Sequence, residues 1–391
     1  MATLINQHPL YNILPVGQDV IFAVSNTSVV SSFTNVKFVA EVHISSTFAP
    51  NLNTSTDIVG TFKTTPNNAG VGMFDFRPII ESFVNADNLA RQGSAYKTVV
   101  NASETNVPLH LIDKYSGNIN SMRYLAIRFK IEYIDAAGDL ITTGIEDSDL
   151  YQIFNGYLKY TDILDLDAND FGYDLTDFEI GTNQKKFLTN APIIQYANGG
   201  DYGTLSFFTL SSTMADDAYT VKFKYYNSSG VIQGTENVNR ATLNGAYDGY
   251  NGYIGMELLY FGCFPANLRN WASDFKTLYN AGTLDGGYYT IQLLSNAAFE
   301  DPTTQTYTIN INCPTLKGYE PIRLCWLNQW GVWDYYTFTM KSSKTISTKG
   351  STYQQLAGSW NESAYRIDSF KGGKKAFRVN ATEKITMNTD F

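Results

Sequence analysis

Charged residues, cysteine and histidine are all scarce in this 391-residue chain. Charged residues make up 17% of it, against roughly 25% in an average soluble protein. Three cysteines without a framework spacing exclude a disulfide scaffold and predict a reduced protein assembled in a cytoplasm. The three histidines form no zinc spacing, and the chain has no phosphate loop and no Gly-x-Ser-x-Gly elbow. We therefore expect no enzymatic activity and no cofactor.

Long hydrophobic runs are also absent. The longest, IGMELLYFGCF, contains a glutamate and two glycines and falls short of the roughly 20 residues that a membrane helix needs. The first fifteen residues have neither a basic nor an apolar region of a signal peptide, so none is expected. The net charge of −9 argues against nucleic acid as a partner. The sequence thus predicts a protein that binds neither membrane nor nucleic acid.

Apolar and aromatic residues, by contrast, are plentiful. Hydrophobic residues make up 43% of the chain and aromatic residues 14%, between many turn formers. Apolar side chains alternate with polar ones in several runs, as in Val36, Phe38 and Ala40, which is typical of strands. The sequence predicts an all-β fold, with strands over 19–25, 35–45, 57–65, 123–135, 218–227, 287–294 and 305–312. Hairpin turns are expected in IDAAGDLIT and YNSSGVIQG, where glycine supplies the positive backbone angle.

Two halves of the chain share a pattern. Each half places Val-Lys-Phe at the start of a strand, at 36–38 and 221–223, and then Gly-Met at 72 and 255. A proline-initiated segment with helical character follows each Gly-Met strand, at 78–92 and 265–282. These offsets of 183–185 residues, with Phe22 and Phe207 also 185 apart, indicate an internal duplication. Chance similarity between two β-rich halves is the alternative.

The duplication predicts two tandem β-sandwich domains of jelly-roll type, each with one short helix. We place them at 1–185 and 186–340, followed by a basic C-terminal arm or hairpin at 341–391. The arm holds nine Lys or Arg and four Asp or Glu, a net charge of +5, which leaves −14 for the rest of the chain. The acidic surface of one copy is expected to meet the basic arm of the next. Two solvated surfaces without a partner are the alternative.

An acidic stretch at 162–179 contains a weak calcium candidate. Asp165, Asp167 and Asn169 have the one-three-five spacing of a calcium loop. The sixth position is Asp170 instead of glycine and the twelfth is Thr176 instead of glutamate, so a solvated acidic loop is the favoured interpretation.

An aromatic cluster surrounds the predicted turn at 328–331. Trp326, Trp330, Trp333 and Tyr335 are candidates for contacts with a glycan or with another subunit. Packing in a core or an interface is favoured over stacking on a sugar ring.

Several segments in this order resemble virion structural proteins of tailed bacteriophages, especially environmental phages and phages of Bacteroidota. They are NVKFVAEVHI, KTTPNNAGVGMFDFRPIIESFV, the FNG of YQIFNGYL, KKFLTNAP, DYGTLSFF and IRLCWLNQWGVWDYYTFTMKSS. The resemblance spans about residues 30–345 and is carried by the order of the segments, since each alone is a strand and a turn. It implies a virion component of the tail, baseplate or fibre-attachment region, assembled in the bacterial cytoplasm, whose partners are copies of itself and other virion proteins. It carries over no catalytic residues.

Three other functions stay open on the sequence. Two tandem jelly rolls in about 390 residues are also similar to the double jelly-roll major capsid proteins of tailless viruses. A receptor-binding protein would use the Trp326–Trp333 turn on a host surface glycan. A polysaccharide depolymerase would need a pair of carboxylates, and no pair stands out in the sequence.

Overall fold

A computed structural model describes residues 3–10, 12–46, 49–87, 115–118, 120–157, 179–180, 186–209, 220–239, 257–294, 305–311, 319–355, 363–364 and 373–389. Contacts group the chain into two compact units, one of 1–313 with 325–336 and one of 314–324 with 337–391. The boundaries at 185 and 340 stay a prediction. The calcium candidate Asp165, Asp167 and Asn169 lies outside the described residues.

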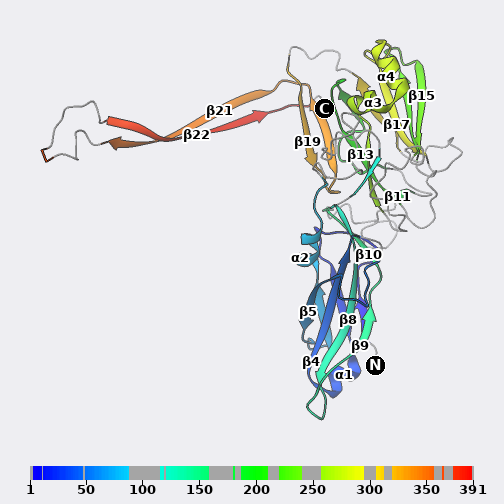
Figure 1. Cartoon of the computed structure of the whole chain (residues 1–391), viewed down its shortest axis with the longest axis vertical. Coiled ribbons are helices and arrows are strands. Elements are labelled where there is room, and N and C mark those ends of the chain that lie inside the picture. The colour runs from blue at the N-terminus through cyan, green and yellow to red at the C-terminus, as the bar shows by residue number, and fades with distance from the viewer. Residues whose placement is uncertain are drawn as a thin grey trace. The chain divides into compact units, whose positions relative to one another are not determined.

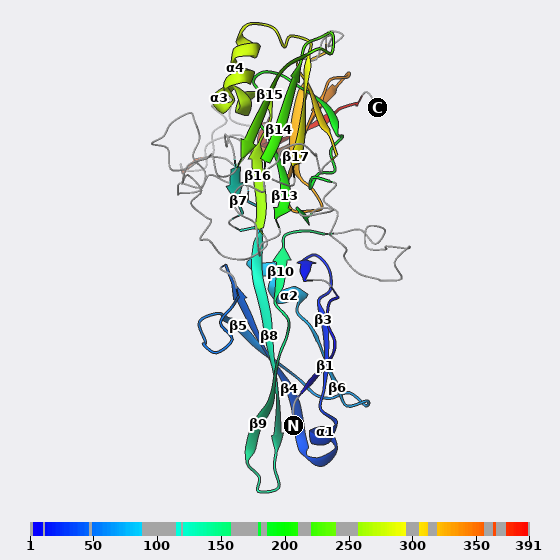
Figure 2. The same cartoon turned by 90° about the vertical axis from the view of Figure 1, so that its right-hand side faces the viewer.

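The first half of the chain forms a β-sandwich (Figures 1 and 2). One sheet has the order β1-β3-β6, and the other has the order β2-β10-β8-β4-β5 with β9 paired to β8. Buried residues of both sheets share one apolar core. The strands are β1 (Leu4–Gln7), β2 (Ile13–Pro15), β3 (Ile21–Ser25), β4 (Thr34–Ser45), β5 (Ile58–Thr64), β6 (Val71–Asp75), β8 (Met122–Ile134), β9 (Leu140–Asp147) and β10 (Tyr151–Phe154).

The second half, together with β7 from the first half, forms another sandwich with its own core. Its sheets have the orders β11-β13-β16-β7 and β12-β18-β17-β14-β15. The strands are β7 (Tyr115–Gly117), β11 (Glu179–Ile180), β12 (Ile194–Ala197), β13 (Thr204–Thr209), β14 (Thr220–Tyr226), β15 (Ile232–Asn239), β16 (Glu257–Gly262), β17 (Tyr288–Leu294) and β18 (Tyr307–Ile311). The all-β sandwich prediction is confirmed.

The two sandwiches repeat one strand order. The larger sheets have the spatial orders β2-β10-β8-β4-β5 and β12-β18-β17-β14-β15, and the strands at matching places in the two sheets follow one another in the same order along the chain. The pair at the start of each order, β2 with β10 and β12 with β18, is parallel. In the smaller sheets, Phe22 pairs with Phe74, and Phe207 pairs with Leu259. Phe207 follows Phe22 by 185 residues, and Leu259 follows Phe74 by the same number. The strand order therefore supports the duplication that the sequence predicts.

This strand order is closer to an immunoglobulin-type sandwich than to the jelly roll that we expected. In each half, two successive strands form a hairpin in the larger sheet, β4–β5 and β14–β15, and a later antiparallel pair lies beside them. That combination gives the G-F-C-C′ sheet opposite the A-B-E strands of immunoglobulin domains. The strand order gives no support to a double jelly-roll capsid protein.

Alternation of side chains places the cores where the sequence predicts them. Phe38, Ala40 and Val42 of β4 are buried with Ile127 and Phe129 of β8. The predicted hairpin turns also form, because Gly138 (φ 89°) and Gly230 (φ 74°) adopt the left-handed backbone that each turn requires. Period-two patterning thus determined both the strands and the faces that they bury.

The helices are short and differ in part from the prediction. The first predicted helix, 78–92, contains only α2 (Arg77–Ile80) and the 3-10 helix η1 (Glu81–Phe83) before Val84 becomes extended. The second predicted helix is divided into α3 (Pro265–Trp271) and α4 (Ser273–Asn280). The sequence did not predict α1 (Thr27–Ser32), whose first turn is capped by Asn26.

Four further strands complete the described chain. β19 (Ile322–Leu327) pairs with β20 (Trp333–Phe338), and β21 (Ser343–Gln355) pairs with β22 (Gly373–Thr386). The second pair is a hairpin, one of the two forms, arm or hairpin, that the sequence left open for residues 341–391.

Candidate functional site

The β21–β22 hairpin is the most exposed element that the structure describes. Its strands have 13 and 14 residues, which at about 3.4 Å per residue makes a ribbon on the order of 45 Å long (Figure 1). Every side chain in it is exposed except Gln355, which is partly buried. Among the described strands none pairs with either outer edge.

The two faces of the hairpin differ. The register pairs Ile346 with Glu383, Lys344 with Ile385 and Gly350 with Val379, so these residues share one face. Exposed fractions of 59% for Ile346, 63% for Val379 and 43% for Ile385 make this face partly apolar and accessible, beside the ion pair of Lys344 with Glu383. The opposite face is polar and basic: Ser343, Thr345, Ser347, Lys349 and Ser351 pair with Thr386, Lys384, Thr382, Asn380 and Arg378.

An exposed hairpin of this kind is an incomplete structure. A two-stranded sheet is marginally stable in water, because it has no second layer on which to bury its apolar face. Unpaired strand edges are in addition templates for another strand. The long β21–β22 ribbon therefore has the character of an element that another surface completes.

The β8–β9 hairpin has the opposite charge. Two of its carboxylates are neutralised, because Lys63 pairs with Glu132 at 2.7 Å and Arg128 with Asp147 at 2.7 Å. Asp139, Glu146 and Asp149 have no ion pair among the described residues.

Apolar side chains accompany these free carboxylates. Leu140 and Ile145 of β9 are 64% and 57% exposed. One backbone bond among the described residues, from Thr3 N to Gly144 O, reaches the outer edge of β9. The β8–β9 hairpin is thus acidic and partly apolar, where the β21–β22 hairpin is basic and partly apolar.

The aromatic turn joins the two sandwiches. Gly331 has φ 69°, and a Cβ there would lie 1.5 Å from the carbonyl oxygen of Asn155, just after β10. Tyr157 N donates a hydrogen bond of 2.7 Å to the Gln329 carbonyl. On the other side, Asn328 Nδ2 donates to the Leu188 carbonyl at 2.9 Å. The turn is therefore held from both halves of the chain.

A buried carboxylate next to this joint links the halves further. Asp87 accepts hydrogen bonds from Asn120 N at 2.6 Å, from the Ser121 hydroxyl, and from the Tyr260 hydroxyl of β16 at 3.1 Å. Trp333 Nε1 donates a hydrogen bond of 3.0 Å to the backbone carbonyl of Asp87. These bonds also account for the early end of the first helix, because they hold Asp87 against Asn120 and Ser121 at the start of β8, and Val84 before it is extended.

A second buried carboxylate, Asp334, holds the start of the second sandwich. It accepts hydrogen bonds from the Thr189 hydroxyl at 2.5 Å and from Asn190 N at 2.8 Å. Burial raises the pKa of Asp334 above its usual value, and these hydrogen bonds act in the opposite direction.

The four predicted aromatic residues lie in or beside this joint. Trp330 and Tyr335 are each 4% exposed, and Tyr335 belongs to the core of the second sandwich. Trp333 packs against the same core, and Trp326 is partly buried. The chain's own contacts therefore occupy most of this cluster, and its contact with a glycan or a subunit stays a prediction.

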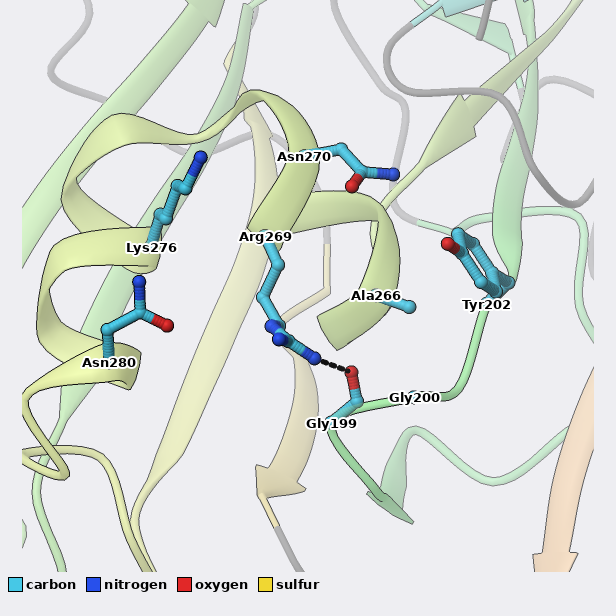
Figure 3. A pocket seen from close by; sticks show the side chains of 8 residues that line it. All are labelled: Gly199, Gly200, Tyr202, Ala266, Arg269, Asn270, Lys276 and Asn280. Carbon is cyan, nitrogen blue, oxygen red and sulfur yellow. Dashed lines mark hydrogen bonds between the residues drawn. The ribbon is translucent and has the colours of Figure 1, made fainter. Parts of the chain in front are cut away.

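A polar pocket of about 370 Å³ lies in the second sandwich (Figure 3). The Gly199–Gly200 loop forms one wall, and Arg269 of α3 donates a hydrogen bond of 3.0 Å to the Gly199 carbonyl. The guanidinium carbon also lies 4.9 Å from the ring centre of Tyr279. Buried Asn267 connects the loop to α3, since its Oδ1 accepts from Gly203 N at 2.9 Å.

Both glycines fit the pocket for different reasons. A Cβ at Gly199 would lie 1.7 Å from the Tyr279 hydroxyl, whereas a Cβ at Gly200 would meet nothing within 4 Å. Gly199 is therefore required for close packing, and Gly200 borders open space. The sequence predicted the helical segment behind the pocket but neither the pocket nor Asp87, because both depend on residues far apart in the chain.

In the described ranges, no group of three metal-ligating side chains is placed to hold a metal ion. No helix there is long and apolar enough to cross a membrane.

Comparisons with known proteins add little. No family model and no curated protein matches the chain. Native alpha-2-macroglobulin of E. coli is 8% identical and covers 96% of this chain, which spans 20% of that chain, with a TM-score of 0.20. The calcium binding domain CBD12 of CALX1.1 is 7% identical, with 80% of this chain and 100% of that chain covered and a TM-score of 0.21. Such low scores carry no argument about function.

Proposed function

We propose that this chain is a non-enzymatic structural component of a tailed bacteriophage virion, in the tail, baseplate or fibre-attachment region. It is assembled in the cytoplasm of the bacterial host and joins copies of itself and other virion proteins. The exposed β21–β22 hairpin carries this proposal, since it is long, has free edges and an unburied apolar face. The ordered resemblance to phage virion proteins over about residues 30–345 supports the location.

A second copy of the chain is the partner that the charge favours. Residues 341–391 carry a net charge of +5 and the rest of the chain −14, so one copy's hairpin is attracted to another copy's body. Electrostatic attraction of this kind speeds association and fixes its register.

The β8–β9 hairpin is the surface on which the β21–β22 hairpin docks. It combines the free carboxylates Asp139 and Glu146 with exposed Leu140 and Ile145. The arriving hairpin brings Lys349 and Lys384 on one face and Ile346 on the other. Docking would bury apolar side chains from both partners, each contributing up to about 1.5–3 kcal/mol. It would also provide strand partners for free edges, as in β-augmentation.

A charge exchange tests this contact. The pair Asp139→Lys and Glu146→Lys should reduce the self-association of the full-length protein, measured as mass by light scattering at low salt. Adding Lys349→Glu and Lys384→Glu to the same chain should restore it, because attraction returns with the signs reversed. Glu81→Lys, an exposed acid in η1, is the matched control and should leave the mass unchanged.

Two results would count against the proposal. A wild-type mass of a single chain at every concentration would remove self-assembly as the function. Association that is unaffected by the Asp139 and Glu146 changes would remove the docking surface. For the location, mass spectrometry of purified particles of the encoding phage should detect the chain in multiple copies.

A further inference from the structure

The pocket between the Gly199–Gly200 loop and helices α3 and α4 is lined by polar side chains that bind few other residues of the chain. Lys276, Asn270 and Asn280 make no side-chain hydrogen bond or ion pair with any described residue. Asn270 Nδ2 is buried without a partner. Arg269 uses one N–H on the Gly199 carbonyl and keeps the others available.

The pocket has positive charge without a compensating acid. Arg269 and Lys276 line it, and no Asp or Glu is among its lining residues. In Figure 3, Arg269 extends to Gly199 between Lys276 and Asn280 on one side and Asn270 and Tyr202 on the other. A ligand with a negative group therefore meets Arg269 in the middle of the pocket, Lys276 at one side and an amide on each side.

We propose that this pocket binds an acidic saccharide, a sugar ring bearing a carboxylate. The carboxylate pairs with Arg269 and Lys276, since charge-assisted hydrogen bonds are the strong ones in such sites. The amides of Asn270 and Asn280 each offer a donor and an acceptor, which matches hydroxyl groups that both donate and accept. The ring of Tyr202 supplies an apolar surface for the face of the sugar.

The volume and the chemistry together favour a saccharide over a simple oxyanion. About 370 Å³ lies within the size range of small-molecule sites and exceeds the needs of a single ion. Sulfate would satisfy the cations but has no O–H for the acceptor oxygens of the two asparagines. Phosphate at neutral pH has only one or two, whereas a sugar ring has several hydroxyl groups. This inference does not depend on the assembly role, because the pocket residues and the docking residues are different.

Saturation-transfer NMR on the full-length protein tests the proposal with three probes: glucuronate, glucose and inorganic phosphate. Glucuronate should receive saturation, glucose should bind at least about tenfold more weakly, and phosphate should not displace glucuronate at equal concentration. Lys276→Gln should weaken glucuronate binding about tenfold through loss of one charged contact. Lys276 is exposed, so the fold should not change.

Two further variants distinguish specific binding in the pocket from unspecific electrostatic attraction to the protein surface. Gly200→Leu should abolish binding, because its side chain enters open space in the pocket without meeting the protein. Lys224→Gln, which removes an equal charge from β14 outside the pocket, should leave binding unchanged. The thermal unfolding midpoint of each variant confirms that it is folded.

The proposal is overturned by any of three results. Glucuronate without saturation would show that the pocket binds no acidic sugar. Full displacement by phosphate would show a plain oxyanion site. Equal weakening by Lys224→Gln would show unspecific attraction to a charged surface.

Discussion

The two sandwiches share a strand order but differ in what connects their strands. After β6 the described residues of the first sandwich continue with the short α2 and η1, residues 77–83, whereas after β16 the second sandwich has α3 and α4, residues 265–280. The α3 and α4 helices bring Arg269 and Lys276 to the Gly199–Gly200 loop and form the pocket. A repeated framework therefore carries different sites, because the connections vary while the paired strands retain their order.

The sandwiches also differ in their buried polar groups. The first contains His43 of β4, which is fully buried, alternates with the core residues Val42 and Ile44, and has no partner for either ring nitrogen among the described residues. The second places Glu236 beside the Tyr225 hydroxyl at 2.8 Å. The sandwiches should accordingly respond alike to the loss of an equivalent apolar residue and in opposite ways to pH.

Removing the equivalent phenylalanines should have the largest effect. Phe22 and Phe207 are both 0% exposed and occupy matching positions, so Phe22→Ala and Phe207→Ala should each cost about 3–5 kcal/mol of the free energy of unfolding. Denaturant unfolding measures both. Phe377→Ala, at a position 77% exposed, is the control and should change stability by less than about 0.5 kcal/mol. A cost below about 1 kcal/mol at either core position would contradict their equivalence.

Loosening the joint between the sandwiches should have an intermediate effect. Gly331→Ala should cost about 2–3 kcal/mol of the free energy of unfolding. A Cβ is disfavoured in the left-handed backbone at this position, and the new Cβ would also meet the Asn155 carbonyl. Gly138→Ala separates these causes, since Gly138 has φ 89° but open space around it, and should cost about 1–2 kcal/mol. Equal costs in calorimetry would show that the close approach to Asn155 is unimportant.

Titration of the buried groups should have the smallest effect and should distinguish the halves by sign. Burial lowers the pKa of His43 from 6.5, an effect that Glu41 partly opposes. The unfolded chain then binds more protons, so this contribution to stability is lost as the pH falls from 6.5 through the folded pKa. Burial raises the pKa of Glu236 from 4.5, so its contribution is lost as the pH rises from 4.5 through the folded pKa.

Urea unfolding across the pH range measures both slopes. His43→Leu should flatten the pH dependence below 6.5, and Glu236→Gln should flatten it above 4.5. Identical pH profiles of wild type and His43→Leu would show that His43 is not kept neutral by burial.

Local patterns in the sequence predicted most elements of the fold. Alternation at Phe38 and Ala40 identified β4, and the glycines of IDAAGDLIT and YNSSGVIQG identified two hairpin turns. The basic composition after residue 340 predicted an arm or a hairpin there, and β21 and β22 form a hairpin. Such features depend on neighbours in the chain, so they can be read without a structure. The first helix was predicted too long, since Asp87 forms hydrogen bonds with Asn120 and Tyr260 instead of continuing it.

By itself, the sequence determined the strands, the repeated unit of about 185 residues and the separation of charge between the arm and the rest. Tertiary structure decided which strands pair, and so chose an immunoglobulin-type order over a jelly roll. It also placed the turn at Gly331 against Asn155, between the two sandwiches, and brought Arg269 to Gly199, 70 residues away in the chain. The reason is physical: a strand's periodicity specifies which face is buried, whereas partners across a sheet or a pocket are selected by packing among distant segments.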